Sequence, residues 1–103
     1  MSLSREDERS LLLNEAAVSA AARDWPRARA HIRRKLAELR ARDMASPDLI
    51  RDYESLLDHG FETFRSELLA PTERAQALRS LHPLAGLIDP KRRFAILRET
   101  RHR

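Results

Sequence analysis

The chain has 103 residues, a length typical of a single domain. It contains no cysteine, which excludes a disulfide scaffold, a thiolate metal site and a cysteine nucleophile. Residues 23–42 carry a net charge of +6, whereas residues 43–70 carry −5. The abundance of alanine and leucine, with only two glycines, favours an all-α fold over a β-sheet.

The first two expected helices cover residues 4–23 and 25–44. Ser4 and Asp7 resemble a capping box at the first start. Asp24 is positioned to cap the second helix, and Pro26 is tolerated in its first turn. The second helix has a face of large apolar residues, namely Trp25, Ala28, Ile32, Leu36 and Leu39.

The third expected helix covers residues 47–69 and has the clearest apolar stripe, formed by Leu49, Ile50, Tyr53, Leu56, Leu57, Phe61, Phe64 and Leu68. Ser46-Pro47 marks its start, and the stripe continues through Gly60 without a change of phase. The continuous phase favours one long helix with a close helix contact at Gly60. A bend or break at Gly60 is the alternative, because single glycines also mark bends.

Two short helices are expected in the remaining chain, over residues 72–81 and 90–101, after Ala70-Pro71-Thr72 and Asp89-Pro90. The predicted architecture is therefore a single domain of residues 1–103. Three long helices form an up-down-up bundle over residues 4–70, and residues 71–103 form a C-terminal arm. The arm packs in cis or on a second copy, so a monomer and a homodimer both remain open.

One segment resembles a single tetratricopeptide-type helix hairpin. The resemblance rests on Leu12, Ala16, Asp24-Trp25, Ala28, Ile32 and Leu36. It departs at Arg23, where glycine is usual, and at Lys35, where alanine is usual. A repeat array needs about three units to bury its faces. No second copy follows in this chain, so we expect a helix hairpin with generic packing.

No arrangement of residues indicates catalysis. The four histidines lack the spacing of a zinc-binding pair, and no serine lies in a glycine-flanked turn. Asp58, His59 and Glu62 are the nearest approach to a metal set, and we interpret them as a solvated helix face. We therefore expect no catalytic residues, no metal, no cofactor and no enzymatic activity.

These observations predict a small helical module that binds another protein, as an adaptor, regulator or chaperone-like factor. The expected partner-binding residues are Trp25 and Tyr53, beside a groove, and Phe94 and Leu97 in the arm. No apolar stretch reaches the roughly 18 residues needed to span a bilayer. A cytoplasmic location without membrane contact is expected.

The alternative is a DNA-binding regulator that uses two basic clusters. Arginine outnumbers lysine 18 to 2 in this chain, and arginine matches phosphate geometry. The candidate nucleic-acid contacts are Arg29, Arg33, Arg40, Lys91, Arg92 and Arg93. The competing interpretation is that the basic second helix neutralises the acidic third helix inside the fold.

Overall fold

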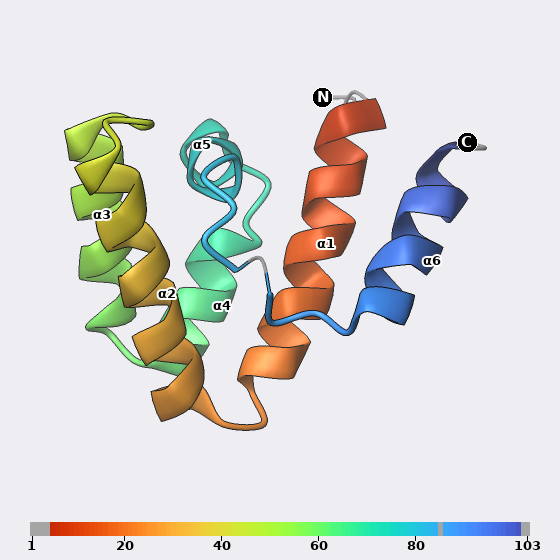
Figure 1. The fold of residues 1–103 in the computed structure, drawn as a ribbon, viewed down its shortest axis with the longest axis horizontal. Coiled ribbons are helices and arrows are strands. Elements are labelled where there is room, and N and C mark those ends of the chain that lie inside the picture. Colours follow the sequence, from red (N-terminus) through yellow and green to blue (C-terminus); the bar gives the residue numbers. More distant parts are fainter. Residues whose placement is uncertain (1–4, 85, 102–103) are drawn as a thin grey trace.

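Six α-helices form the fold within residues 5–84 and 86–101, the residues that the computed structural model describes (Figure 1). They are α1 (Arg5–Ala21), α2 (Trp25–Ala41), α3 (Pro47–Leu57), α4 (Phe61–Leu68), α5 (Glu73–Arg79) and α6 (Pro90–Arg101). The predicted all-α class is thus confirmed. The expected cap Ser4 lies outside the described residues.

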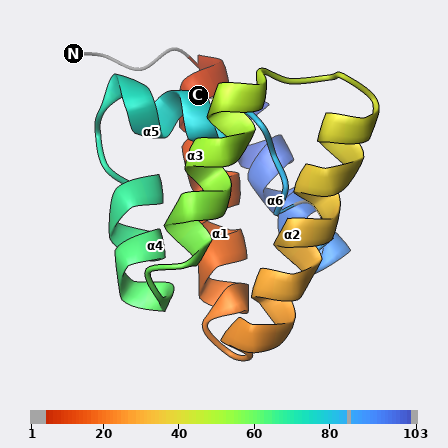
Figure 2. The same ribbon diagram turned by 90° about the vertical axis from the view of Figure 1, so that its left-hand side faces the viewer.

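The turn between α1 and α2 contains the capping aspartate and the proline that the sequence predicts there. A side-chain oxygen of Asp24 accepts a hydrogen bond from the Arg27 N–H at 3.3 Å, and Pro26 lies in the first turn of α2. The helix ends at Ala41, before the expected residue 44, and Asp43 has a positive φ of 53°. Local capping therefore explains how α1 and α2 become neighbouring helices (Figure 2).

The prediction of one helix over residues 47–69 is wrong, because the chain turns at residues 58–60. Gly60 has φ 89° and ψ 168°, a region that only glycine occupies at low cost. Phe64 and Leu68 are nevertheless fully buried. The hydrophobic stripe thus identified the buried residues correctly, while the geometry that buries them is a helical hairpin of α3 and α4.

The hydrophobic core draws on five helices and on the segment after α5. Its members include Val18 of α1, Ile32 and Leu36 of α2, Ile50, Tyr53 and Leu57 of α3, Phe64 and Leu68 of α4, Leu78 of α5, and Leu84. Leu78 and Leu84 belong to the expected arm, residues 71–103, so that segment contributes to the same core as the first 70 residues.

A buried arginine joins α5 to the end of α4. Arg79 is 3% exposed, and its guanidinium donates hydrogen bonds to the carbonyl oxygens of Leu68 at 2.7 Å and Ala70 at 3.1 Å. Carbonyl groups at a helix C-terminus lack partners within the helix and favour cations. Arg79 therefore caps the C-terminus of α4 and fixes the position of α5 relative to it.

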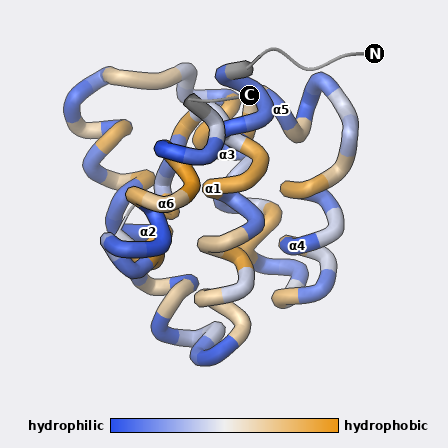
Figure 3. The backbone as a smooth tube through the Cα atoms, turned by 90° about the vertical axis from the view of Figure 1, so that its right-hand side faces the viewer, coloured by the Kyte–Doolittle hydropathy of each residue, from blue (hydrophilic) through white to orange (hydrophobic). Residues whose placement is uncertain are grey.

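The last helix lies at one side of the molecule and packs chiefly on α1 (Figure 1). Its bounds match the expected 90–101, and the Asp89 carbonyl oxygen accepts a hydrogen bond from the Arg93 N–H at 2.9 Å. Ile96 and Thr100 face α1 and are buried, and the Thr100 hydroxyl accepts a hydrogen bond from Arg9 Nε at 3.2 Å. Viewed from this side, α6 carries both hydrophilic and hydrophobic residues (Figure 3).

Replacing Gly60 by alanine tests the break between α3 and α4. A Cβ at Gly60 meets no atom within 4 Å, so the backbone conformation alone opposes the substitution. We expect Gly60→Ala to lower the free energy of unfolding by about 1–3 kcal/mol. In a continuous helix the same change would raise it by about 1 kcal/mol. Urea unfolding followed by circular dichroism measures the sign.

The matched control is Thr63→Ala, at an exposed position in α4. We expect a change within about 0.5 kcal/mol for this variant, because surface substitutions away from special features have small effects. A stabilised Gly60→Ala variant would contradict the observed turn.

Candidate functional site

The basic and acidic helices neutralise each other in part. Arg33 of α2 forms an ion pair with Asp58, and Arg40 of α2 forms one with Glu54 of α3. The hydrogen bond and charge of Glu54 raise the pKa of Arg40. Because both ion pairs are solvent-exposed, they contribute little to the free energy of unfolding. Their main effect is to favour the orientation in which these sides of α2 and α3 face each other.

These ion pairs engage two of the three α2 arginines expected to contact nucleic acid. The third, Arg29, is exposed and forms no ion pair within the described residues. On the outward side of α2, Arg27 and Arg34 are exposed together with Ala30, Ala37 and Ala41. The predicted α2 cluster is therefore divided: Arg33 and Arg40 contact carboxylates of the protein itself, whereas Arg29 belongs to the remaining exposed cationic surface.

Trp25 and Tyr53, two of the expected partner-binding residues, lie in an aromatic cluster where α2, α3 and α4 meet. The Trp25 ring centroid lies 5.0 Å from that of Phe64 and 5.5 Å from that of Phe61, and the Tyr53 centroid lies 6.1 Å from that of Phe64. Trp25 is half-buried, whereas Tyr53 has no exposed surface. In this conformation Tyr53 has no surface available for a partner.

The other two expected partner-binding residues, Phe94 and Leu97, are one turn apart on α6 and differ in exposure. Phe94 is 63% exposed. Leu97 is half-buried and lines a pocket between α6 and α1, together with Arg93. The structure thus brings Leu97 and Arg93 together at this pocket, whereas Phe94 is not part of its lining.

We call the outer side of α6 the Phe94 surface, defined by Lys91, Phe94, Ala95 and Arg98. All four residues are exposed, and their spacing of three, four and seven places them along one helix side. The Arg98 guanidinium carbon lies 5.9 Å from the centroid of the Phe94 ring, within the range of a cation–π contact. An apolar ring therefore lies among cations on an open helix face.

The acidic residues considered as a metal set are engaged separately. Asp58 contacts Arg33, Glu62 contacts Arg65, and His59 Nδ1 lies 2.7 Å from the Ser55 carbonyl oxygen. Within residues 5–84 and 86–101, no group of three or more His, Asp or Glu side chains is arranged to hold a metal ion. In the same part of the chain, none of the helices combines the length and apolar character needed to cross a bilayer.

Comparison with known proteins yields no match at a significant level, whether with family models, curated proteins or solved structures.

The burial of Tyr53 predicts a specific loss of stability in alkali. Burial raises the pKa of this single tyrosine above its ordinary value of 10.0. The unfolded chain therefore loses the phenolic proton at a lower pH than the folded chain. We expect the free energy of unfolding to fall by about 1.4 kcal/mol per pH unit above pH 10 from this group.

Tyr53→Phe is the control, because it removes the titrating group and keeps the ring. We expect the free energy of unfolding of the wild type, relative to that of Tyr53→Phe, to fall by about 1.4 kcal/mol per pH unit above pH 10. Urea unfolding of both proteins at a series of pH values measures this difference. Tyrosinate absorbance that develops near pH 10 in a protein with full helix content would contradict the burial.

Proposed function

We propose that this protein is a non-catalytic interaction module, an adaptor or regulator, that docks the Phe94 surface of α6 against another protein. The observation that carries the proposal is the exposure of Phe94, at 63%, on a helix whose opposite side already packs on α1. Folding does not use this ring, since Ile96 and Thr100 form the buried side of α6. The Phe94 ring is therefore available for a partner.

Aromatic and arginine side chains are the residue types that most often dominate binding energy at protein interfaces. Full burial of a phenylalanine side chain contributes about 1.5–3 kcal/mol. Arg98 lies over the ring and remains exposed, so it can reach a carboxylate while its contact with Phe94 is kept. An exposed helix with one apolar anchor suits a helix-in-groove mode of recognition.

The charge of α6 indicates an acidic partner. Residues 90–100 carry four cations, Lys91, Arg92, Arg93 and Arg98, against the single carboxylate of Glu99. Two copies of α6 face to face would bring like charges together, which opposes a homodimer through this surface. We therefore assign the surface to a different protein that presents carboxylates around an apolar groove.

Replacing Phe94 by alanine tests the docking surface. The protein is immobilised on a resin and incubated with an extract of its source cells. We expect one acidic protein to bind in stoichiometric amount and to be released by salt. Because interface anchors contribute about 2 kcal/mol or more, Phe94→Ala should weaken the binding of that protein by about 30-fold or more. Titration calorimetry with the purified partner measures the change.

Met44→Ala is the matched control, because Met44 is, among the described residues, the other large apolar side chain with high exposure, at 66%. It lies in the connection after α2, away from α6. Equal binding by wild type and Phe94→Ala, or equal losses for both variants, would overturn the proposal. Circular dichroism verifies that helix content is unchanged.

Nucleic-acid binding is the second candidate, and one observation favours it. Lys91, Arg92 and Arg98 form no ion pair within the described part of the chain, and an exposed aromatic ring lies among them. Cations beside an aromatic ring are also a feature of surfaces that bind nucleic acid. Arg29 on α2 is a further uncompensated cation, whereas Arg33 and Arg40 already contact carboxylates.

Anisotropy of a labelled DNA duplex discriminates the two candidates. Under the nucleic-acid alternative, binding is micromolar at low salt and weakens steeply between about 50 mM and about 200 mM salt. Replacing Lys91, Arg92 and Arg93 together by glutamine then weakens binding to every sequence alike. Absence of binding at low salt rejects this alternative and supports a protein partner.

A further inference from the structure

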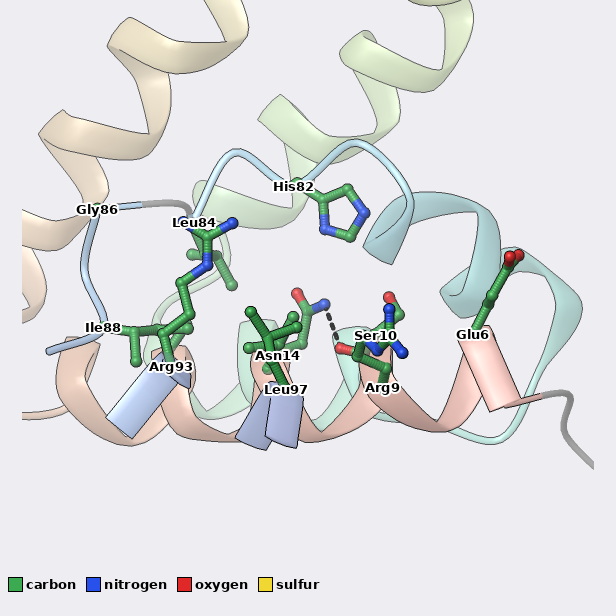
Figure 4. A pocket seen from close by; sticks show the side chains of 12 residues that line it. Glu6, Arg9, Ser10, Asn14, His82, Leu84, Gly86, Ile88, Arg93 and Leu97 are labelled. Atoms are coloured by element: carbon green, nitrogen blue, oxygen red, sulfur yellow. Dashed lines mark hydrogen bonds between the residues drawn. The ribbon is translucent and has the colours of Figure 1, made fainter. Parts of the chain in front are cut away.

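A pocket of about 390 Å³ lies between α1, residues 82–84 and 86–88, and α6 (Figure 4). Pockets for small molecules occupy about 300–1,000 Å³. The apolar part of the wall comes from all three elements, with Leu13 from α1, Leu84 and Ile88 from the connecting segment, and Leu97 from α6. The polar half of the lining is formed by Glu6, Arg9, Ser10, Asn14, His82 and Arg93. Such a mixed lining suits a ligand that has both an apolar body and polar groups.

The pocket contains a buried hydrogen-bond acceptor that has no partner. Asn14 is 3% exposed, and its Nδ2 donates to the Ser10 carbonyl oxygen at 2.8 Å. Within the part of the chain that the structure describes, its Oδ1 accepts no hydrogen bond. In Figure 4 this oxygen points away from Ser10, toward the segment that carries His82 and Leu84. A buried acceptor without a donor is unfavourable, and a ligand with an N–H or O–H group would satisfy it.

The Arg93 guanidinium provides positive charge at one end of the same pocket, and Arg9 of α1 is the other cation of the lining. The Arg93 guanidinium extends from α6 toward Leu84, and Arg93 forms no ion pair within the described residues (Figure 4). Partial burial, and after it the charge of Arg93, lowers the pKa of His82, so the two groups influence each other across the pocket. The one carboxylate of the lining, Glu6, lies at the opposite end (Figure 4). The Arg93 end therefore favours an anion.

The connecting segment is shaped by two residues with left-handed backbone. His82 has φ 52° and Gly86 has φ 96°. A Cβ at Gly86 would lie 3.3 Å from the His31 ring, so the segment approaches α2 closely there. Positive φ is uncommon for a residue other than glycine, and the conformation of His82 places its imidazole at the pocket.

We propose that this pocket binds a small organic anion that has an apolar body and an N–H or O–H donor. The anionic group pairs with Arg93, the donor reaches Asn14 Oδ1, and the apolar body lies against Leu84, Ile88 and Leu97. The pocket takes Arg93 and Leu97 from α6 and none of the four residues of the Phe94 surface, so a ligand there leaves that surface uncovered.

The probe that matches this chemistry is 8-anilinonaphthalene-1-sulfonate, which combines a sulfonate, a naphthalene and a phenyl ring, and an anilino N–H. We expect one molecule to bind per chain, measured by titration calorimetry, and the melting temperature to rise with probe concentration. Arg93→Gln should weaken binding by about tenfold or more, because a hydrogen bond to a charged group is lost. The neutral analogue N-phenyl-1-naphthylamine should be insensitive to this substitution.

The matched control is Arg92→Gln, which removes the same charge from an exposed neighbouring position outside the pocket. We expect its affinity to stay within about twofold of wild type. Equal effects of the two substitutions, or binding of several probe molecules per chain, would overturn the proposal.

A second variant tests the acceptor. In Asn14→Leu, leucine has a shape similar to that of asparagine and lacks Oδ1. We expect this variant to bind the probe more weakly, while the melting temperature of the free protein is not lowered. Unchanged affinity in a folded Asn14→Leu variant would overturn the role of Asn14. Phe94→Ala should bind the probe normally, so a failure of this site and a failure of the docking surface are distinguishable.

Discussion

Phe64 can pack at the centre of the protein because the chain reverses at Gly60. The reversal places α4 beside α3, and the Phe64 ring then lies between Trp25 of α2 and Tyr53 of α3. Aromatic pairs at such distances contribute about 0.5–1.5 kcal/mol beyond the burial of their area. Leu68, one turn further along, joins the same core, and its carbonyl oxygen at the C-terminus of α4 accepts a hydrogen bond from Arg79. The position of α5, and with it the path toward α6, follows from that reversal.

The charges of the chain are distributed according to the same packing. Once α3 lies beside α2, Glu54 and Asp58 face Arg40 and Arg33, and the opposite net charges of the two segments are partly compensated inside the protein. The helix beside α6 is α1, which carries four carboxylates, Glu6, Asp7, Glu8 and Glu15, against Arg5 and Arg9. Within the described residues, Lys91, Arg92 and Arg98 of α6 nevertheless form no ion pair, so exposed positive charge remains on α6 and on the outward side of α2. A charged surface of this kind affects partner choice and association rate more than it affects the fold.

Local signals in the sequence were sufficient for the class of fold and for several boundaries. Asp24-Trp25-Pro26 and Asp89-Pro90 specify helix starts through capping and through the fixed φ of proline, and both predictions are confirmed. The break at Gly60 was not resolved, because a continued helix and a reversed one bury the same residues, Phe64 and Leu68. The roles of Arg79 and Asn14 depend on groups contributed by other segments of the chain, and no local pattern marks them. Tyr53 belonged to the predicted stripe, yet only the fold shows that no part of it remains exposed.

The two proposals concern neighbouring surfaces of one helix, and this links them energetically. Without a ligand, α6 is attached to α1 through Ile96, Thr100 and the hydrogen bond from Arg9. An anion between Arg93 and Asn14 would add contacts that exist only while α6 is docked on α1, so its binding would stabilise the docked position. A protein that recognises the Phe94 surface in that position would then bind more tightly when the pocket is occupied, and by reciprocity it would tighten the binding of the anion. A partner that binds α6 only after its release from α1 would show the opposite sign, because release dismantles the pocket.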